Sequence, residues 1–345
     1  MAAFRANPQS PGNPLSPPND RLPLKAFYTD SFVLPLPDGH RFPMAKYTGI
    51  RELGLRKGVL SPDELEIPPA AAWEELARVH HADYLHRVRT GLLSESEQRR
   101  IGFPWTEQMV ERSRRSVGAT IAAGRYALQV SDTGRWGVAA NLAGGTHHAH
   151  ADHGEGFCVF NDAAVATRVW QAEHLVERVA VVDLDVHQGN GTADIFSSDP
   201  SVFTFSVHAA KNYPFRRALS SLDVDLPDGS ADDVFLHALD VHLPQVISGF
   251  QPDIVVYLAG ADPYLDDRFG RLALTKDGLR ARDERVLRAC SDAAIPVVIT
   301  MAGGYGRNTA DTVDIHVATL SVAVQISNGL RSGTERLGEP SHTLV

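Results

Sequence analysis

The chain has 345 residues, 43% of them hydrophobic and 22% charged, which is the composition of an ordinary soluble globular protein. Its formal charge of -9 and its isoelectric point near 5.9 argue against a general binder of nucleic acid or of anionic membranes. No apolar stretch approaches the roughly 18 residues that span a bilayer, and the first residues lack the apolar core of a signal peptide. Because only two cysteines occur, Cys158 and Cys290, we expect a cytoplasmic protein without a disulfide framework.

The sequence predicts a single folded domain with a tail at each end. Residues 1–22 contain five prolines among Asn, Ser and Gly, a composition that buries too little apolar surface to order itself. Length alone would suggest about two domains, but no linker divides residues 23–330 and no internal repeat occurs in them. We therefore expect a flexible N-terminal tail at 1–22, one domain at 23–330 and a polar C-terminal tail at 331–345.

Strand and helix patterns alternate along this domain. In chain order we expect a strand at 26–33, a loop at 35–43, helices at 46–54, 70–77 and from 80 onward, a long helix at 106–130, a strand at 136–142, a helix at 161–176, a strand from 178, a short helix, a strand at 201–208, a helix at 232–248, a strand at 253–262, a helix at 279–293, a strand from 295 and a helix at 313–329. This alternation is typical of β-α-β units with right-handed crossovers. It predicts a single-domain α/β protein with a mostly parallel, doubly wound sheet flanked by helices.

Polar residues follow the strand that begins at residue 178. Asp183, Asp185 and His187 occupy every second position, so they point to one side as this strand ends. Gly189 and Gly191 then let the backbone turn away, as in the crevices where open α/β sheets bind ligands. We therefore expect a functional site at the carboxyl edge of the sheet.

The ends of four predicted strands carry groups that could meet at this edge: His147 with His148, Asp185 with His187, Asp262, and Tyr305. Two carboxylates and one imidazole with a free position fit a catalytic site for Zn²⁺ or another first-row divalent ion. A hydrogen-bonded loop and a Mg²⁺ site are the alternative interpretations.

Acid and base groups are also present. The two adjacent histidines suit proton transfer near neutral pH, and Asp183 and Asn190 are positioned to orient their rings. Tyr305, among glycines, can donate a hydrogen bond to an oxyanion.

Other candidates have plainer interpretations. We expect Cys158 to be a small buried hydrophobe rather than a nucleophile. His150 and His153 are predicted as solvated loop residues, with adventitious metal binding as the alternative. Lys46 is a candidate for the floor of the pocket.

Together these motifs resemble the histone deacetylase family of zinc-dependent amidohydrolases, which have the arginase-like fold. The matching motifs are Gly144-Gly-Thr-His-His-Ala149, Gly156-Phe-Cys158, Asp183-Leu-Asp-Val-His-Gln-Gly-Asn190, Ala259-Gly-Ala-Asp262 and Gly303-Gly-Tyr305. They occur in family order and cover roughly residues 26 to 329. The Asn161-Asp162 pair and the runs ending at Asn190 and Asp262 look most like the class IV branch and its bacterial relatives.

The resemblance implies one zinc ion held by Asp185, His187 and Asp262. It implies that His148 is the general base toward water and then protonates the leaving amine. His147, oriented by Asp183, would give electrostatic support, and Tyr305 would stabilise the oxyanion.

The resemblance also implies a narrow channel for an acylated, lysine-like chain and a second cation. The substrate-binding positions that match are Gly156, Phe157, Tyr213 and Gly304. The positions that match a monovalent cation site, for K⁺, are Asp183, Asp185, Ser206 and the backbone of His187 and Val207.

Two departures from the family pattern concern the catalytic base and the rim. In the class I branch an aspartate stands where this chain has Asn190, so we expect His148 to titrate lower here. The rim aspartate with which several relatives hold the substrate backbone has no counterpart between Arg87 and Pro104.

The leading hypothesis is a metal-dependent deacylase acting on an acyl-lysine side chain of a protein or peptide. An acetylpolyamine amidohydrolase is the nearest alternative, with Asp266 and Asp267 as an acidic entrance or, more plainly, as a solvated loop. An arginase-type ureohydrolase would need a second set of metal ligands.

A non-catalytic acyl-lysine-binding scaffold is disfavoured because all catalytic positions are filled. The sequence makes no prediction of oligomeric state.

Overall fold

The computed structural model of the chain describes residues 24–329, and the tails predicted at 1–22 and 331–345 lie outside the described residues. One sheet of eight strands, in the order β2-β1-β3-β8-β7-β4-β5-β6, runs through the centre, and every pair of neighbours is parallel. The strands are β1 (Lys25–Phe27), β2 (Leu65–Glu66), β3 (Val138–Asn141), β4 (Val179–Asp183), β5 (Val202–Ala209), β6 (Leu222–Leu226), β7 (Ile254–Leu258) and β8 (Val297–Thr300).

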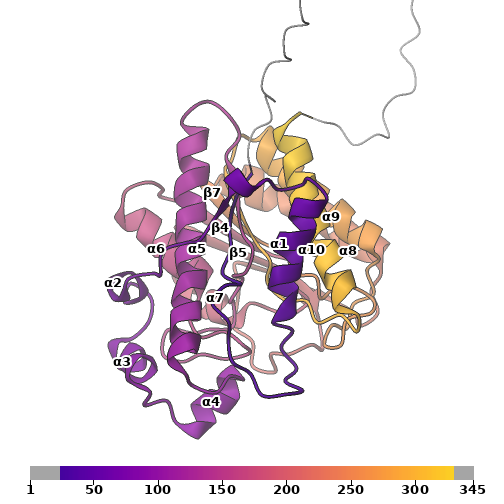
Figure 1. The fold of residues 1–345 in the computed structure, drawn as a ribbon. Coiled ribbons are helices and arrows are strands. Elements are labelled where there is room, and N and C mark those ends of the chain that lie inside the picture. The colour runs from indigo at the N-terminus through magenta and orange to yellow at the C-terminus, as the bar shows by residue number, and fades with distance from the viewer. Residues whose placement is uncertain (1–23, 330–345) are drawn as a thin grey trace, which may run out of the picture.

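Helices cover both faces of the sheet (Figure 1). One face packs against α1 (Ala45–Arg56), α8 (Asp232–Pro244), α9 (Lys276–Asp292) and α10 (Thr309–Ser327). The other packs against α5 (Glu107–Ser131) and α6 (Asp162–Ala172), with α7 (Asn190–Phe196) beside α6. Helix α2 (Trp73–Leu76) lies beside α5 and α6, whereas α3 (Ala82–Thr90) and α4 (Glu95–Ile101) lie near the amino end of α5. The predicted fold class is thereby confirmed.

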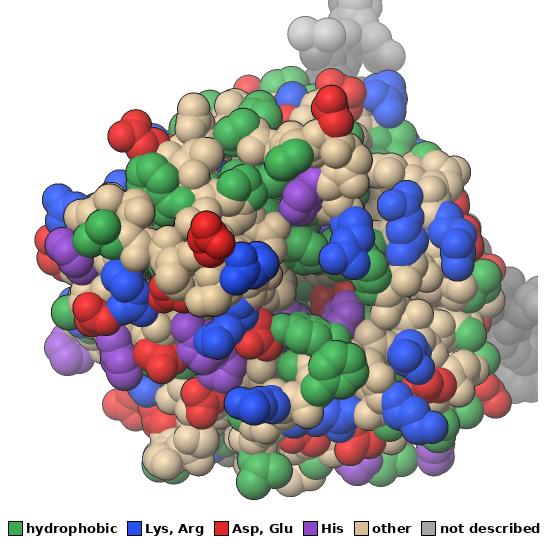
Figure 2. Space-filling model, turned by 90° about the horizontal axis from the view of Figure 1, so that it is seen from below, with side chains coloured by type: hydrophobic (Ala, Val, Ile, Leu, Met, Phe, Trp, Pro, Cys, Tyr) green, Lys and Arg blue, Asp and Glu red, His purple; other side chains and the backbone are tan. Residues whose placement is uncertain are grey.

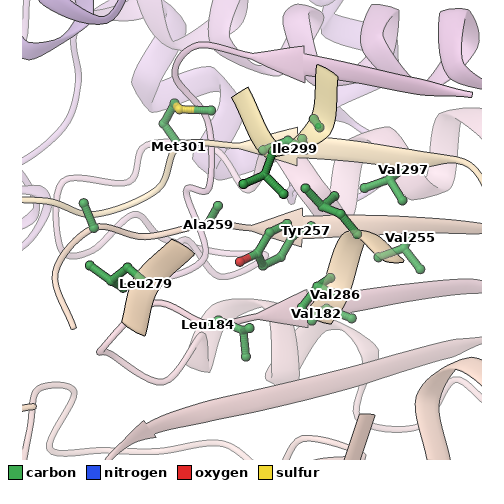
Figure 3. Packing of buried hydrophobic residues seen from close by; sticks show 14 of the residues in the cluster. Val182, Leu184, Val255, Tyr257, Ala259, Leu279, Val286, Val297, Ile299 and Met301 are labelled. Carbon is green, nitrogen blue, oxygen red and sulfur yellow. The ribbon is translucent and has the colours of Figure 1, made fainter. Parts of the chain in front are cut away.

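The central strands β3, β8, β7 and β4 are apolar up to their last residue because both of their faces are buried. In β4, Val179 and Val181 join the hydrophobic cluster on the α5 side, whereas Ala180 and Val182 join the cluster on the α9 side. Figure 3 shows the α9 side, where Val182, Tyr257 and Ile299 come from three neighbouring strands of this cluster. This two-sided burial produces the β-branched runs that the sequence shows.

Some elements differ from those predicted. The strand expected at 26–33 spans only Lys25–Phe27, and the helix expected at 232–248 ends at Pro244, after which one π-helical turn follows. Strand β2 and edge strand β6 were not predicted, and β6 carries Asp223 and Asp225 at its half-exposed surface, so it lacks the apolar run of a buried strand. Helix α4 was also missed because its only buried residue is Ile101.

The topology decides where a site can form. Strands β3, β8, β7 and β4 are consecutive in the sheet, so the loops after their carboxyl ends meet along one edge. Gly144 to His148 follow β3, and Asp185 to Asn190 follow β4, whose last residue is Asp183. Asp262 follows β7, and Gly303 to Tyr305 follow β8. Within residues 24–329, none of the helices combines the length and the apolar character that a membrane crossing requires.

Candidate active site

Two carboxylates and an imidazole converge at the centre of this edge. Nδ1 of His187 lies 2.9 Å from Oδ1 of Asp185 and 3.3 Å from Oδ2 of Asp262. The ligand atoms of the three residues all lie within 4.8 Å of one another, and all three residues are buried. They come from the loops after β4 and β7, which are adjacent strands.

These residues fit a metal ion. Oδ2 of Asp262 is buried and receives no hydrogen bond of good geometry from the described residues. Burial and the nearby charge of Asp185 raise the pKa of Asp262 to about 7, which shows how costly a second bare carboxylate is here. A Cβ atom at Gly303 would lie 1.8 Å from Oδ2 of Asp262, so only glycine leaves room beside that oxygen. The donor set suits a divalent ion with a position left for substrate or water.

His147 has a carboxylate as its partner. Its Nδ1 bonds to Oδ2 of Asp183 at 2.7 Å, and both side chains are buried. Burial alone would lower the pKa of His147, but the charges of Asp183 and Asp185 outweigh it and raise this pKa to about 9. The carboxylate of Asp183 therefore favours the protonated ring of His147.

His148 has the opposite character, because its partner is neutral. Its Nδ1 lies 2.7 Å from Oδ1 of Asn190, an acceptor, so Nδ1 carries the proton and Nε2 is left with a free lone pair. Burial, followed by the charges of His147 and His187, holds the pKa of His148 well below its usual value. Two adjacent histidines with their pKa values pushed apart can divide the work between a charge and a proton acceptor.

Replacing Asn190 with Asp is expected to move the acidic limb of the pH profile upward. A proton acceptor must be neutral, so kcat/KM rises as the pH increases through the pKa of His148. A carboxylate beside Nδ1 favours the charged ring and raises that pKa by about one to two units. The measurement is kcat/KM against pH for the two proteins with one acyl substrate. An acidic limb that stays in place would show that a group other than His148 sets it.

Tyr305 is placed by Asp267, a carboxylate for which the sequence predicted other roles. Its backbone N–H donates to Oδ2 of Asp267 at 2.6 Å, and Oδ1 of Asp267 accepts from the backbone N–H groups of Phe269 and Gly270. Burial, followed by the charge of Asp262, raises the pKa of Tyr305 well above its usual value, so the phenol keeps its proton. Tyr305 is therefore a neutral hydrogen-bond donor beside the acidic cluster.

The pair at 266–267 was considered as an acidic entrance or a solvated loop, and Asp267 is neither. Its side chain is buried and holds the Tyr305 loop, whereas Asp266 pairs with Arg307 at 3.1 Å. A polar residue in a loop carries no pattern that distinguishes these roles, so only the structure could find Asp267.

Lys46 of α1 lies beneath the same loop. Its Nζ donates to the carbonyls of Ala302 at 3.1 Å and of Gly304 at 3.4 Å, and it lies 5.4 Å from the centroid of the Tyr305 ring. Lys46 is fully buried and is not part of the cavity wall. Gly304 is likewise behind the wall, where a Cβ atom would meet Thr312 at 2.7 Å.

A cavity of about 750 Å³ leads to the cluster. Aromatic rings form much of its wall: Phe42, Tyr47, Phe157, Tyr213, Phe215, Phe269 and Tyr305. Gly156 also lines it, and a Cβ atom there would lie 2.7 Å from the His148 ring. The hydroxyl of Tyr213 donates to Glu155, which fixes its ring beside His148. The structure thus brings Gly156, Phe157 and Tyr213 together around the channel.

Cys158 lines the cavity, and His150 approaches the site through Asn190, whose Nδ2 lies 3.2 Å from Nε2 of His150. Cys158 is buried, and burial raises the pKa of its thiol well above the usual range, so it is not a thiolate nucleophile. The rings of His150 and His153 stack with 4.5 Å between their centroids. His150 bonds to Asp194 and His153 bonds to Asp152, and both carboxylates are exposed. Neither histidine belongs to the metal-binding group.

The positions that match a monovalent cation site lie at the ends of β4 and β5. Asp183 and Ser206 are paired in the register of these strands, and both are buried. Ser206 Oγ lies 2.9 Å from Nδ1 of His208. Val207 follows in β5 and is fully buried.

Comparison with known proteins agrees with this geometry. A sequence model described as "Histone deacetylase domain" matches residues 40–320. An uncharacterized protein of Picosynechococcus is 45% identical over 84% of this chain and 94% of its own length. Histone deacetylase 2 of Arabidopsis thaliana is 30% identical over 82% of this chain and 74% of its own. The crystal structure of an HDAC homologue from Aquifex aeolicus matches with a TM-score of 0.73 at 22% identity, over 90% of this chain and 85% of that one.

Proposed function

The chain belongs to the histone deacetylase family, and from this membership we propose that it is a zinc-dependent deacylase acting on acyl-lysine side chains of proteins or peptides. The observation that carries the proposal is the pair His147 and His148, one bonded to the carboxylate of Asp183 and the other to the neutral amide of Asn190, beside the group Asp185, His187 and Asp262. An acyl-amide hydrolase needs a charge, a proton acceptor and an oxyanion donor within one site.

Each residue has a definite task in this proposal. Zinc held by Asp185, His187 and Asp262 would supply Lewis acidity toward the acyl carbonyl and toward water. Nε2 of His148 accepts the proton of the attacking water and later donates it to the leaving amine, whose nitrogen would otherwise be a poor leaving group. The cation of His147 stabilises the negative charge that develops, and the hydroxyl of Tyr305 donates to the oxyanion.

The channel and the second cation complete the proposal. Phe157 and Tyr213 flank an unbranched lysine stem, whose methylene groups pack on aromatic faces while water is excluded. The buried carboxylate of Asp183, together with Asp185, Ser206 and the backbone of His187 and Val207, is proposed to hold K⁺. The proposed place of action is the cytoplasm.

The test is acyl release from a matched panel, using zinc-loaded and chelator-treated protein. The panel contains acetyl-, butyryl-, octanoyl- and myristoyl-lysine peptides and acetylated polyamines. We expect release from at least one lysine peptide, lost on chelation and restored by zinc. Release from the polyamines alone would replace the lysine substrate with a small amine, and no release from any compound would contradict the enzymatic proposal.

The polyamine alternative would need an acidic entrance for a cationic substrate. Asp267 is buried and Asp266 is paired with Arg307, so neither is available to form that entrance. The structure does not favour this alternative.

A further inference from the structure

In the cavity, negatively charged side chains lie at the floor and positively charged side chains lie at the mouth. The carboxylates in its wall are Asp185 and Asp262, and both belong to the buried metal-binding group at the floor. The other charged side chains of the wall, histidines aside, are exposed cations at the mouth: Arg41, Arg99, Arg100, Lys211, Arg268 and Arg271. Figure 2 shows Lys and Arg side chains on several sides of a hollow with acidic and histidine side chains inside it. The rim of the cavity is therefore basic, although the whole chain has a formal charge of -9.

Most of this rim charge is not neutralised locally. Arg99 pairs with Glu95 at 3.2 Å, and Arg271 pairs with Asp228 at 3.0 Å. The other four rim cations have no carboxylate at ion-pair distance among the described residues: Arg41, Arg100, Lys211 and Arg268. Their charge is available to a ligand, since a cation without a partner attracts an anion more strongly than a paired one.

The backbone ties part of this rim to the channel wall. The carbonyl of Arg100, at the end of α4, accepts from the N–H of Gly156 at 3.1 Å, and the carbonyl of Ile101 accepts from the N–H of Phe157 at 2.7 Å. Arg100 is thus anchored next to the proposed lysine channel. This is the segment between Arg87 and Pro104 in which the sequence offered no rim aspartate.

We propose that the preferred substrates carry negative charge next to the acyl-lysine along the peptide, at the mouth of the channel, as an acyl-lysine flanked by aspartate or glutamate does. The proposal rests on the deacylase function above and adds a substrate class to it. Acidic flanks would meet the unpaired rim cations, whereas basic flanks would add like charges at a mouth that is already positive. Cationic polyamines are disfavoured for the same reason.

The experiment compares three acetyl-lysine peptides of equal length with acidic, neutral or basic residues on both sides of the lysine, hydrolysed by the zinc-loaded full chain. We expect kcat/KM to fall by about threefold to tenfold at each step from acidic to neutral to basic, mainly through KM. The differences should shrink in 1 M NaCl, where the Debye length is about 3 Å.

Charge reversal identifies the residues responsible. In the double variant Arg100→Glu/Lys211→Glu, the order of the peptides should invert. The single variants Arg100→Glu and Lys211→Glu should each weaken the preference, and Arg135→Glu is their matched control, because Arg135 is exposed just before β3, at the opposite edge of the sheet. It should keep the order of the wild-type chain, and melting temperatures of all variants should agree because the replaced side chains are exposed.

The outcomes separate this inference from the proposed function. Hydrolysis of all three peptides at equal rates would overturn the acidic preference. An unchanged order in the double variant would overturn its assignment to Arg100 and Lys211. Both results leave the deacylase intact. Hydrolysis of none of these peptides at any salt concentration, together with no acyl release from any compound of the panel above, would overturn the deacylase function and the inference with it.

Discussion

Tyr305→Phe is expected to lower kcat by about 10²–10³-fold, the usual effect of losing one oxyanion donor. The variant loses only the hydroxyl of residue 305. Asp267 still holds the backbone of that residue, and its ring still packs against Phe269, with 4.9 Å between the ring centroids. KM, zinc content and melting temperature should therefore change little. The measurements are steady-state kinetics on an acyl-lysine peptide and metal analysis of the purified variant.

A second tyrosine variant serves as the control. Tyr126→Phe removes a hydroxyl from the half-buried surface of α5, away from the cavity, and should leave kcat unchanged. Full turnover by Tyr305→Phe would remove Tyr305 from the mechanism. A large loss of zinc together with turnover would instead mean that the hydroxyl stabilises the metal site.

Arg282→Leu is expected to lower the free energy of unfolding by about 3–5 kcal/mol, because it leaves a buried charge without its partner. Arg282 is fully buried in α9 and bonds to Asp283 at 2.8 and 3.0 Å. The hydroxyls of Tyr257 and Thr319 donate to the same carboxylate at 2.5 and 2.6 Å. Urea unfolding in the presence of a chelator measures the effect without a contribution from zinc binding.

The guanidinium also supports the metal-binding loops. It donates to the carbonyl of Leu184 at 3.3 Å and to that of Gly260 at 2.6 Å, next to Asp185 and Asp262. We therefore expect weaker zinc binding in Arg282→Leu as well as lower stability.

Arg285 in the same helix provides a matched control. It pairs with Asp240 at 2.7 Å, but both side chains are substantially exposed, so Arg285→Leu should cost less than about 1 kcal/mol. Equal losses in the two variants would show that burial of the Arg282–Asp283 pair does not matter.

The sequence by itself determined the fold class and the core of the site. Because both of their faces are buried, β4, β7 and β8 can be recognised in the sequence as apolar runs. A polar residue directly after such a run then marks the end of the strand as a candidate site. Alternation along the chain after β4 was enough to group Asp185 with His187. The parallel direction expected from alternating strands and helices was enough to place Asp262 and Tyr305 at the same edge. These features depend on local periodicity, which a sequence displays directly.

Tertiary structure alone decided the partners and the charges around that core. Asp267 differs from Asp266 only in where a loop folds, yet one holds the backbone of Tyr305 and the other pairs with Arg307. The basic rim gathers side chains from distant segments, and the polar helix α4, which brings Arg99 and Arg100 to it, has almost no apolar face to reveal it. Hydrogen bonds and electrostatic fields depend on distances of a few ångströms between residues far apart in the chain, and no local pattern encodes those distances.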